Sequence, residues 1–380
     1  MTRAWLAVLA VTLGIFSLMT SELLPVGLLT PVRASLHVSE GTAGLMVTAP
    51  GVVAAFAAPV IAVTAGRLDR RALLAALIAL VGAANLACAV APNYAVVLTA
   101  RVLVGVGVGG FWAIAGGLAL RLVPPAHVPR ATAVVFGGVS TASVLGVPAG
   151  TLLGELSGWR TAFAAVGVLG LVALGALVFL LPPLPSEQTM TFPDLSRLFR
   201  DNAGVRVGMA LTFLLITGHF VAYTFVRPIL HDVSGVDDGL IGLLLLGYGV
   251  AGVVGNFAVG TRNPRGTLLG ITATLTAALT LIALLGGVPA AGIALLLVWG
   301  LAYGGVPVSL QTWMLSAAPR ATEAATSLFV AVFNLSIAIG ALLGAFVVDG
   351  ITTAAALWTG AAFTLLTGLT VWRVQRTAAR

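Results

Sequence analysis

Two charged side chains lie well inside long apolar runs of this sequence, where they could carry acid–base chemistry. Glu22 lies about seven residues from the end of its run, and Arg101 about six residues from the start of another. At 1.5 Å per helical residue, these positions correspond to depths of about 10 and 9 Å. Apolar surroundings favour the neutral form of a carboxyl group. Glu22 could therefore bind and release a proton near neutral pH.

The similar depths predict that Glu22 and Arg101 interact when Glu22 is ionised, because an unpaired charge in a low-dielectric site is costly. Protonation of Glu22 would then break the pair and release Arg101. Two alternatives compete with this prediction: a permanent, purely structural ion pair, and an Arg101 side chain that extends to the membrane surface. We assign proton coupling to Glu22 and Arg101.

Aromatic and polar side chains that could hold a solute concentrate in the second half of the chain. His219 and Tyr223 are four residues apart, as are Trp299 and Tyr303, so each pair lies on one face of a helix. His219 also occupies the position that Glu22 occupies 197 residues earlier. Helix packing explains these residues equally well. The predicted substrate-binding residues are His219, Tyr223, Trp299, Tyr303, Gln311 and Trp112.

Two further motifs have residues that suit a role in gating. In the segment 66–71, Asp69 can accept hydrogen bonds from a helix N-terminus, and the arginines can pair with acids. In the segment 146–154, glycines recur every fourth residue around a proline, which favours a kinked helix with close neighbours. Membrane anchoring is the alternative explanation for the arginines of 66–71, and ordinary helix packing is the alternative for the glycines of 146–154. The predicted gating residues are Gly66, Asp69, Arg70, Gly146, Pro148 and Gly150.

Composition indicates which elements position these side chains. Of the 380 residues, 59% are apolar and 8% are charged, against roughly 25% charged residues in soluble proteins. This excludes a soluble enzyme, a nucleic-acid-binding domain and a disordered protein. A membrane-spanning helix needs about 20 mostly apolar residues. Twelve such runs are present, at 4–29, 42–63, 72–91, 95–119, 131–154, 161–181, 205–228, 240–260, 267–287, 290–313, 324–347 and 353–372.

The positions of the arginines predict how these helices are oriented. With twelve spans, fifteen arginines fall on the side of the two termini and only three on the other side. Positive residues favour the cytoplasmic side, so both termini are expected there. Arg227, one of the three, is expected to reach the outer membrane surface.

An internal repeat predicts two related halves. Gly150 and Gly154 are matched by Gly340 and Gly344 at the same ordinal helix of the second half. The predicted organisation is a six-helix bundle at 1–181, a cytoplasmic linker at 182–204 and a second bundle at 205–380. Parallel halves around a midplane site are typical of secondary transporters. A single cysteine and four scattered histidines indicate no metal site, no cofactor and no enzymatic activity.

Several motifs resemble those of one transporter family. They include Arg101-Val-Leu with Gly109-Gly-Phe-Trp112, Gly146-Val-Pro-Ala-Gly150 and Tyr223-Thr-Phe-Val-Arg-Pro228. The chain resembles the twelve-helix drug:proton antiporters of the major facilitator superfamily, in the branch of arabinose-type efflux permeases and purine ribonucleoside efflux pumps. The resemblance implies an all-α membrane protein of two pseudo-symmetric six-helix bundles.

The same resemblance implies a function and a location. A monomer in the bacterial inner membrane would export a small neutral or amphipathic solute, such as a purine nucleoside, sugar or drug, in exchange for protons. Its partners would be the solute, protons and the lipid bilayer, and not nucleic acid. A proton-symporting importer of the same fold is the alternative. A membrane sensor that transports nothing is a further one, although it gives Glu22 and Arg101 no reason to lie inside the bilayer.

Overall fold

The computed structural model describes residues 2–65, 68–115, 118–185, 191–258 and 264–378. Within these residues all regular secondary structure is helical, and twelve helical segments are long and apolar enough to cross a membrane. The twelve predicted spans are therefore confirmed. The largest difference is in the first span, where the helix continues to Leu36 instead of ending near residue 29.

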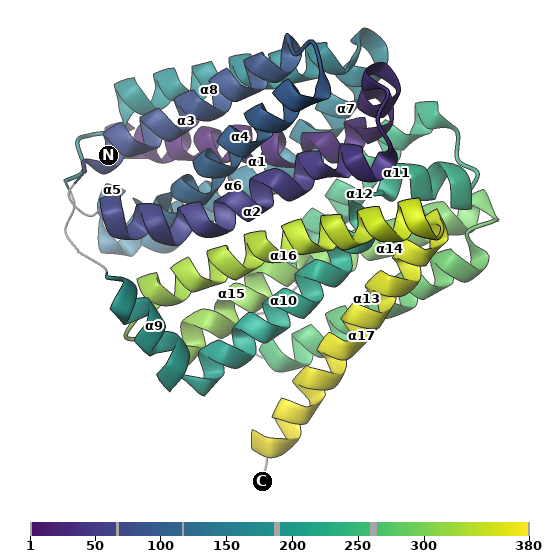
Figure 1. Cartoon of the computed structure of the whole chain (residues 1–380). Helices are drawn as coiled ribbons and strands as arrows, with labels where there is room; N and C mark the ends of the chain where they lie inside the picture. Colours follow the sequence, from purple (N-terminus) through teal and green to yellow (C-terminus); the bar gives the residue numbers. More distant parts are fainter. Residues whose placement is uncertain (1, 66–67, 116–117, 186–190, 259–263, 379–380) are drawn as a thin grey trace.

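The chain forms a bundle in which the helices of each half lie together (Figure 1). The first half contains α1 (Thr2–Leu36), α2 (Glu40–Thr64), α3 (Arg70–Ala89), α4 (Tyr94–Ala115), α5 (Leu118–Leu122), η2 (Pro125–His127), α6 (Val128–Thr141), η3 (Ala142–Gly146), α7 (Val147–Ser157) and α8 (Trp159–Leu180). The second half contains α10 (Ala203–Tyr223), α11 (Val226–Pro228), η4 (Ile229–Val233), α12 (Asp238–Ala258), α13 (Pro264–Leu285), α14 (Pro289–Gly304), α15 (Val306–Ala317), α16 (Thr322–Gly350) and α17 (Thr353–Ala378). Between them lies the short helix α9 (Phe192–Asp201).

The buried apolar side chains form two clusters. One is built from residues 7–184 and the other from residues 205–371, each with a few side chains contributed by the other half. Burial of apolar surface therefore holds each set of helices together around its own core. We use "the α1–α2 end" for the end of the bundle where α1 ends and α2 begins, and "the opposite end" for the end with α9.

The fifth span is interrupted, as its proline predicted. The π-turn η3 separates α6 from α7 and ends at Gly146, two residues before Pro148. A proline removes one helical hydrogen bond, and a π-turn is one way in which a helix accommodates this loss. The packing of η3 and α7 against both α1 and α12 places the interruption between the two halves.

Glycines of the fifth span lie directly against α1. A Cβ atom added at Gly146 would overlap the hydroxyl of Thr20, and one added at Gly150 would press on Leu24. In the second half, Gly340 of α16 packs in the same way on the main chain of Thr217 in α10. The two halves thus use the same close contact between their first and fifth spans, as expected for a repeat.

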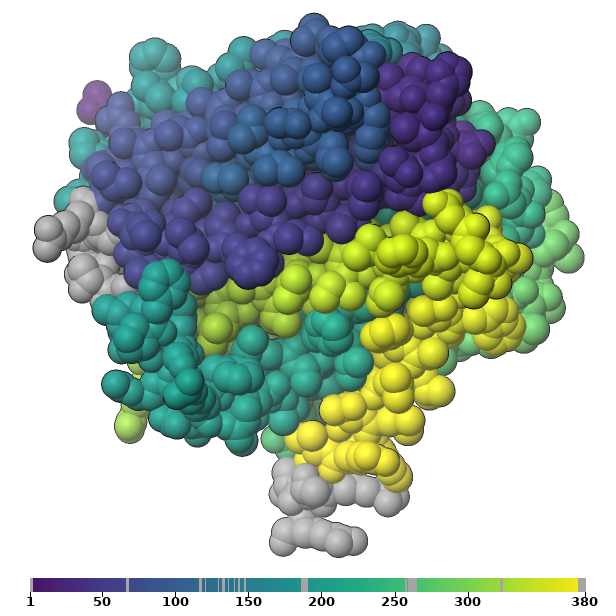
Figure 2. All heavy atoms as spheres, viewed as in Figure 1, coloured from purple at the N-terminus to yellow at the C-terminus, as the bar shows by residue number. Residues whose placement is uncertain are grey.

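The halves meet along α2 and α16. Figure 2 shows the spheres of these two helices in contact over much of their length, in purple-blue and yellow-green. Gly41, Gly44 and Gly51 of α2 face α16 and its neighbours so closely that a Cβ atom at any of them would need its neighbour to move. Small residues allow helix backbones to approach in this way.

Candidate functional site

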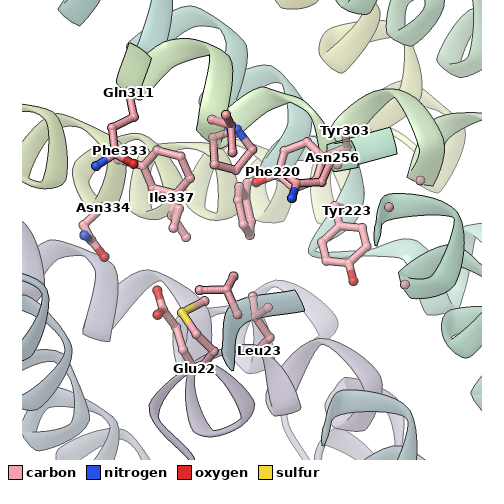
Figure 3. Close-up of a pocket in the computed structure, with 18 of the residues that line it drawn as sticks. Glu22, Leu23, Phe220, Tyr223, Asn256, Tyr303, Gln311, Phe333, Asn334 and Ile337 are labelled. Carbon is pink, nitrogen blue, oxygen red and sulfur yellow. The ribbon is translucent and has the colours of Figure 1, made fainter. Parts of the chain in front are cut away.

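A cavity lies between the two halves. Its volume is about 250 Å³, close to the lower end of the roughly 300–1,000 Å³ that small-molecule sites occupy. The first half lines it with Met19, Glu22, Leu23, Trp112 and Val139, and all other lining residues come from the second half. Figure 3 shows Glu22 and Leu23 on one wall, facing aromatic and amide side chains on the other.

The cavity extends from the depth of Glu22 toward the opposite end of the bundle. Its lining includes Asn256, which is two residues from the end of α12, and Thr326, which is near the start of α16. Both helix termini lie at the opposite end. The space is therefore displaced from the α1–α2 end.

Four of the predicted substrate-binding residues line this cavity, namely Trp112, Tyr223, Tyr303 and Gln311. His219 and Trp299 do not, because they are buried behind the wall with 1% and 0% of their surface exposed. In this structure they cannot contact a solute in the cavity directly, and they act on it only by positioning the lining residues that cover them.

His219 forms the centre of an aromatic stack. Its ring is nearly parallel to that of Tyr303, with centroids 3.4 Å apart, and it stacks on Tyr223 at 4.9 Å. Trp299 donates a hydrogen bond from Nε1 to Nδ1 of His219 at 3.1 Å. Because Nδ1 accepts this bond, the neutral imidazole carries its proton on Nε2, which has no partner among the described residues. His219 thus fixes the relative positions of two tyrosines on the cavity wall.

Other lining residues were missed at the sequence level. Phe220, Tyr248, Asn256 and Asn334 all face the cavity. Asn256 and Asn334 are isolated polar residues within apolar runs, the same signal that identified Glu22. They could have been found by that rule, had it been applied to amides as well as to charges.

Arg101 is completely buried and binds main-chain oxygens of two other helices. Its Nη1 and Nη2 donate to the carbonyl oxygens of Ser21 and Glu22 at 2.8 and 3.1 Å, and Nε donates to that of Met46 at 3.0 Å. The guanidinium therefore joins α4 to α1 and α2. Five donors in a rigid fork make arginine suited to such a multiple contact.

Two prolines explain why two of these main-chain oxygens lack their usual helical hydrogen bond. A helical carbonyl normally accepts from the N–H four residues later, and proline has no N–H. Pro25 stands four residues after Ser21, and Pro50 stands four residues after Met46. Arg101 thus donates to two oxygens that the prolines leave without their usual helical partners.

The structure shows no direct ion pair between Glu22 and Arg101, and their interaction when Glu22 is ionised stays a prediction. No contact within 4.0 Å joins their charged groups, and the Arg101 guanidinium is instead occupied by main-chain oxygens. The Glu22 side chain lines the cavity and is 7% exposed. Similar depth was correctly predicted, but depth alone does not say which acceptor the guanidinium finds.

Arg227 is also not where the sequence predicted. It is buried instead of reaching the membrane surface, and its Nη1 lies 3.0 Å from Oε1 of Glu155 in the first half. The same nitrogen donates to the carbonyl oxygen of Gly27 at 3.2 Å, and Nη2 lies 3.3 Å from Asp238. The contacts with Glu155 and Gly27 join the two halves at the α1–α2 end, whereas Asp238 belongs to the same half as Arg227.

A second polar contact joins the halves at that end. Asp349, in the last turn of α16, accepts hydrogen bonds from the main-chain N–H of Gly41 at 3.0 Å and the hydroxyl of Ser39 at 2.9 Å. Its carboxylate therefore lies at the N-terminus of α2, where the helix dipole favours negative charge.

The predicted gating loop lies at the opposite end. Gly66 is outside the described residues. Asp69 caps the first turn of α3 and accepts a hydrogen bond from the N–H of Leu184 at 2.7 Å. Arg70 donates from its side chain to the carbonyl oxygen of Ala65 at 2.8 Å. Asp69 thus joins the loop to the segment that follows α8, whereas the Arg70 side chain joins the start of α3 to the end of α2.

Comparisons with known proteins identify the family and the fold. The sequence model of the Major Facilitator Superfamily matches residues 10–326. The transcription regulatory protein OpdE of Pseudomonas aeruginosa PAO1 is 37% identical over 374 residues, which are 96% of this chain and 92% of that protein. The purine ribonucleoside efflux pump NepI of Escherichia coli K12 is 35% identical over 373 residues, covering 97% and 93%. The human organic anion transporter MFSD10 has a similar fold, with a TM-score of 0.75 at 19% identity and coverage of 97% and 99%.

Proposed function

Because the chain belongs to the Major Facilitator Superfamily and is a multi-pass membrane transporter, not an enzyme, we propose that it exports a small neutral or amphipathic solute in exchange for protons. The exported solute is a purine nucleoside, a sugar or a drug of similar size. The protein acts as a monomer in the inner membrane of a bacterium, with both termini in the cytoplasm.

The observation that carries this proposal is the position of Glu22. It is the one acidic side chain among the residues that line the cavity. A carboxyl group there can be protonated and can face a solute, and a transporter needs both at one place to couple their movements. Arg101 acts as a positioning residue, because it binds the main chain of Glu22 and of the preceding residue.

The transport cycle follows from the two ends of the bundle. The contacts of Arg227 and Asp349 hold the halves together at the α1–α2 end, which the arginine count assigns to the outside. The cavity extends toward the opposite, cytoplasmic end, from which the solute enters. Solute binding favours loss of the proton from Glu22, and the halves then rock to expose the solute outside. Proton entry supplies about 2.3 kcal/mol per 100 mV of membrane potential.

The interrupted fifth span and the loop before α3 serve as gating elements. Gly146, Pro148 and Gly150 place an irregular turn between α1 and α12. Asp69 holds the start of α3 to the segment leaving α8, and the Arg70 side chain holds it to the end of α2. We assign Asp69 and Arg70 to gating at the opposite end. We assign Gly146, Pro148 and Gly150, whose glycines pack on α1 at Thr20 and Leu24, to movement between the halves at the depth of Glu22.

Accumulation of solute by vesicles with an imposed pH gradient tests the function. The protein is reconstituted into liposomes with acid interiors, and radiolabelled inosine, arabinose and chloramphenicol are offered outside. An antiporter accumulates its solute when the interior is acid, because protons leave as solute enters. We expect accumulation of at least one probe, and its loss in Glu22→Gln, while exchange of labelled for unlabelled solute without a gradient persists.

The matched control is Asp194→Asn, which removes an exposed carboxylate in the linker, far from the cavity. It should accumulate solute like the unaltered protein. Accumulation only with acid exteriors would instead establish a symporting importer. Absence of accumulation for all three probes under both gradients would overturn transport in favour of a sensor. Gradient-driven accumulation by Glu22→Gln would move the proton site elsewhere.

A further inference from the structure

Three amide side chains share the cavity with the aromatic wall. Asn256 comes from α12, Gln311 from α15 and Asn334 from α16, and none was predicted to act with the others. Figure 3 shows all three directed toward the same space, across from Glu22. Three separate helices thus bring the same functional group to one site.

These amides have unused hydrogen-bonding capacity. The side chains of Asn256 and Gln311 make no hydrogen bond within the described part of the chain, and Asn334 uses only its Nδ2, which donates to the carbonyl oxygen of Val330 at 2.9 Å. An amide group offers one acceptor oxygen and two donor hydrogens. A polar group in an apolar site costs free energy unless it finds a partner, so a ligand or water must supply that partner.

The surrounding wall favours a flat ligand without charge. Phe220, Tyr223 and Tyr303 line the cavity, and the latter two are held in a stack by His219. Their rings offer faces for offset stacking. Among the lining residues no side chain is cationic, and Arg101 is buried behind the wall, so an anionic ligand would meet only the carboxyl group of Glu22.

Resting on the export function proposed above, we infer that Asn256, Gln311 and Asn334 select the solute by hydrogen-bonding the edge of a flat, uncharged heterocycle that stacks on the aromatic wall. Recognition is then carried by the second half of the chain and proton binding by the first. This division separates choice of solute from energy coupling, since each is located on a different side of the cavity.

Equilibrium binding to the purified protein, without any gradient, tests the inference. The probes are inosine and purine riboside, which has the same ring and sugar but lacks the oxo group and the adjoining ring N–H. The unaltered protein should bind inosine about tenfold more tightly. Gln311→Met and Asn256→Leu keep side-chain volume but remove the hydrogen bonds. Each should weaken inosine binding about three- to tenfold, as expected for one or two lost hydrogen bonds, and leave purine riboside nearly unchanged.

Leu284→Met, an exposed apolar change outside the cavity lining, is the control and should keep the preference for inosine. If the ratio of inosine to purine riboside affinity is the same in the unaltered protein and in both amide variants, the inference is overturned. Export would still stand if solute accumulation in acid vesicles persists. Accumulation of arabinose without measurable binding of either nucleoside would also overturn it and leave export intact. A failure of all accumulation would contradict export alone, because the binding ratio is measured without transport.

Discussion

Arg227 and Glu155 come from different halves of the chain, and their charged groups lie 3.0 Å apart at the α1–α2 end. The arginine side chain is 6% exposed and that of the glutamate 19%. Removal of the Glu155 carboxylate costs free energy, because it leaves the buried guanidinium of Arg227 with a charged partner, Asp238, only within its own half. The pair therefore favours the form of the protein in which this end is closed.

We expect Glu155→Gln to shift the protein toward the form that is open at the α1–α2 end. A loss of about 1–2 kcal/mol changes the ratio of the two forms about five- to thirtyfold. Spin labels at cysteines replacing the exposed Leu156 and Ile351 would report the separation of the halves in a Cys88→Ala background. Arg33→Gln removes a pair within the first half and should leave the distance distribution unchanged. A distribution that Glu155→Gln does not alter would contradict the assigned role.

The contact of Arg101 with oxygens freed by prolines makes a prediction about stability. Arg101→Met should lower the melting temperature in detergent, because it leaves buried carbonyls without donors. Pro25→Ala and Pro50→Ala supply the missing N–H groups. In the variant with both alanines, the loss caused by Arg101→Met should therefore be clearly smaller than in the unaltered background. Equal losses in the two backgrounds would show that Arg101 stabilises the helices in another way.

Close packing of the fifth span on α1 makes Gly146 sensitive to a single methyl group. We expect Gly146→Ala to destabilise the protein by about 1–3 kcal/mol and to reduce solute accumulation, because its Cβ atom would overlap Thr20, two residues before Glu22. Thr20→Ala should restore part of both. Gly137→Ala is the control in the same span, since no atom lies within 4 Å of its added Cβ. Similar effects of the two alanines would disprove the role of packing.

The orientation predicted from the arginines can be tested by labelling. Single cysteines at Ser196 in α9 and at Gly287 between α13 and α14 are both exposed and lie at opposite ends of the bundle. In intact cells, with Cys88 replaced by Ala, an impermeant maleimide should label Gly287→Cys only. Labelling of Ser196→Cys alone would reverse the orientation, and with it the direction of the proposed transport.

The twelve spans could be predicted because each depends only on a local run of apolar residues. The depths of Glu22 and Arg101 could be predicted for the same reason. Their partners could not, because Arg101 had several acceptors to choose from, and the two oxygens that compete with a carboxylate become visible only when each proline is read together with the residue four positions before it.

The positions of Arg227 and His219 show a second limit. A count of arginines on each side treats every loop alike, so it cannot distinguish an arginine at the surface from one buried between halves. Helical periodicity placed His219 and Tyr223 on one face, and they do stack. It could not show that only Tyr223 reaches the cavity, since this depends on how α14 packs on α10.

The glycines at the contact between α2 and α16 have a consequence for how the two halves move relative to each other. At Gly51 the backbones of α2 and α16 approach directly, and Gly41 and Gly44 leave room for the side chains of Asp349 and Phe225. Because these three positions of α2 carry no side chain that could interlock with its neighbours, one helix can roll on the other with few rotamer changes. The free-energy barrier to movement of α2 against α16 should then be low. The barrier to rocking of the two halves would come chiefly from the polar contacts at the α1–α2 end. Such a division would allow the speed of the cycle to be tuned by substitutions of a few charged residues, while the sliding surface itself is left intact.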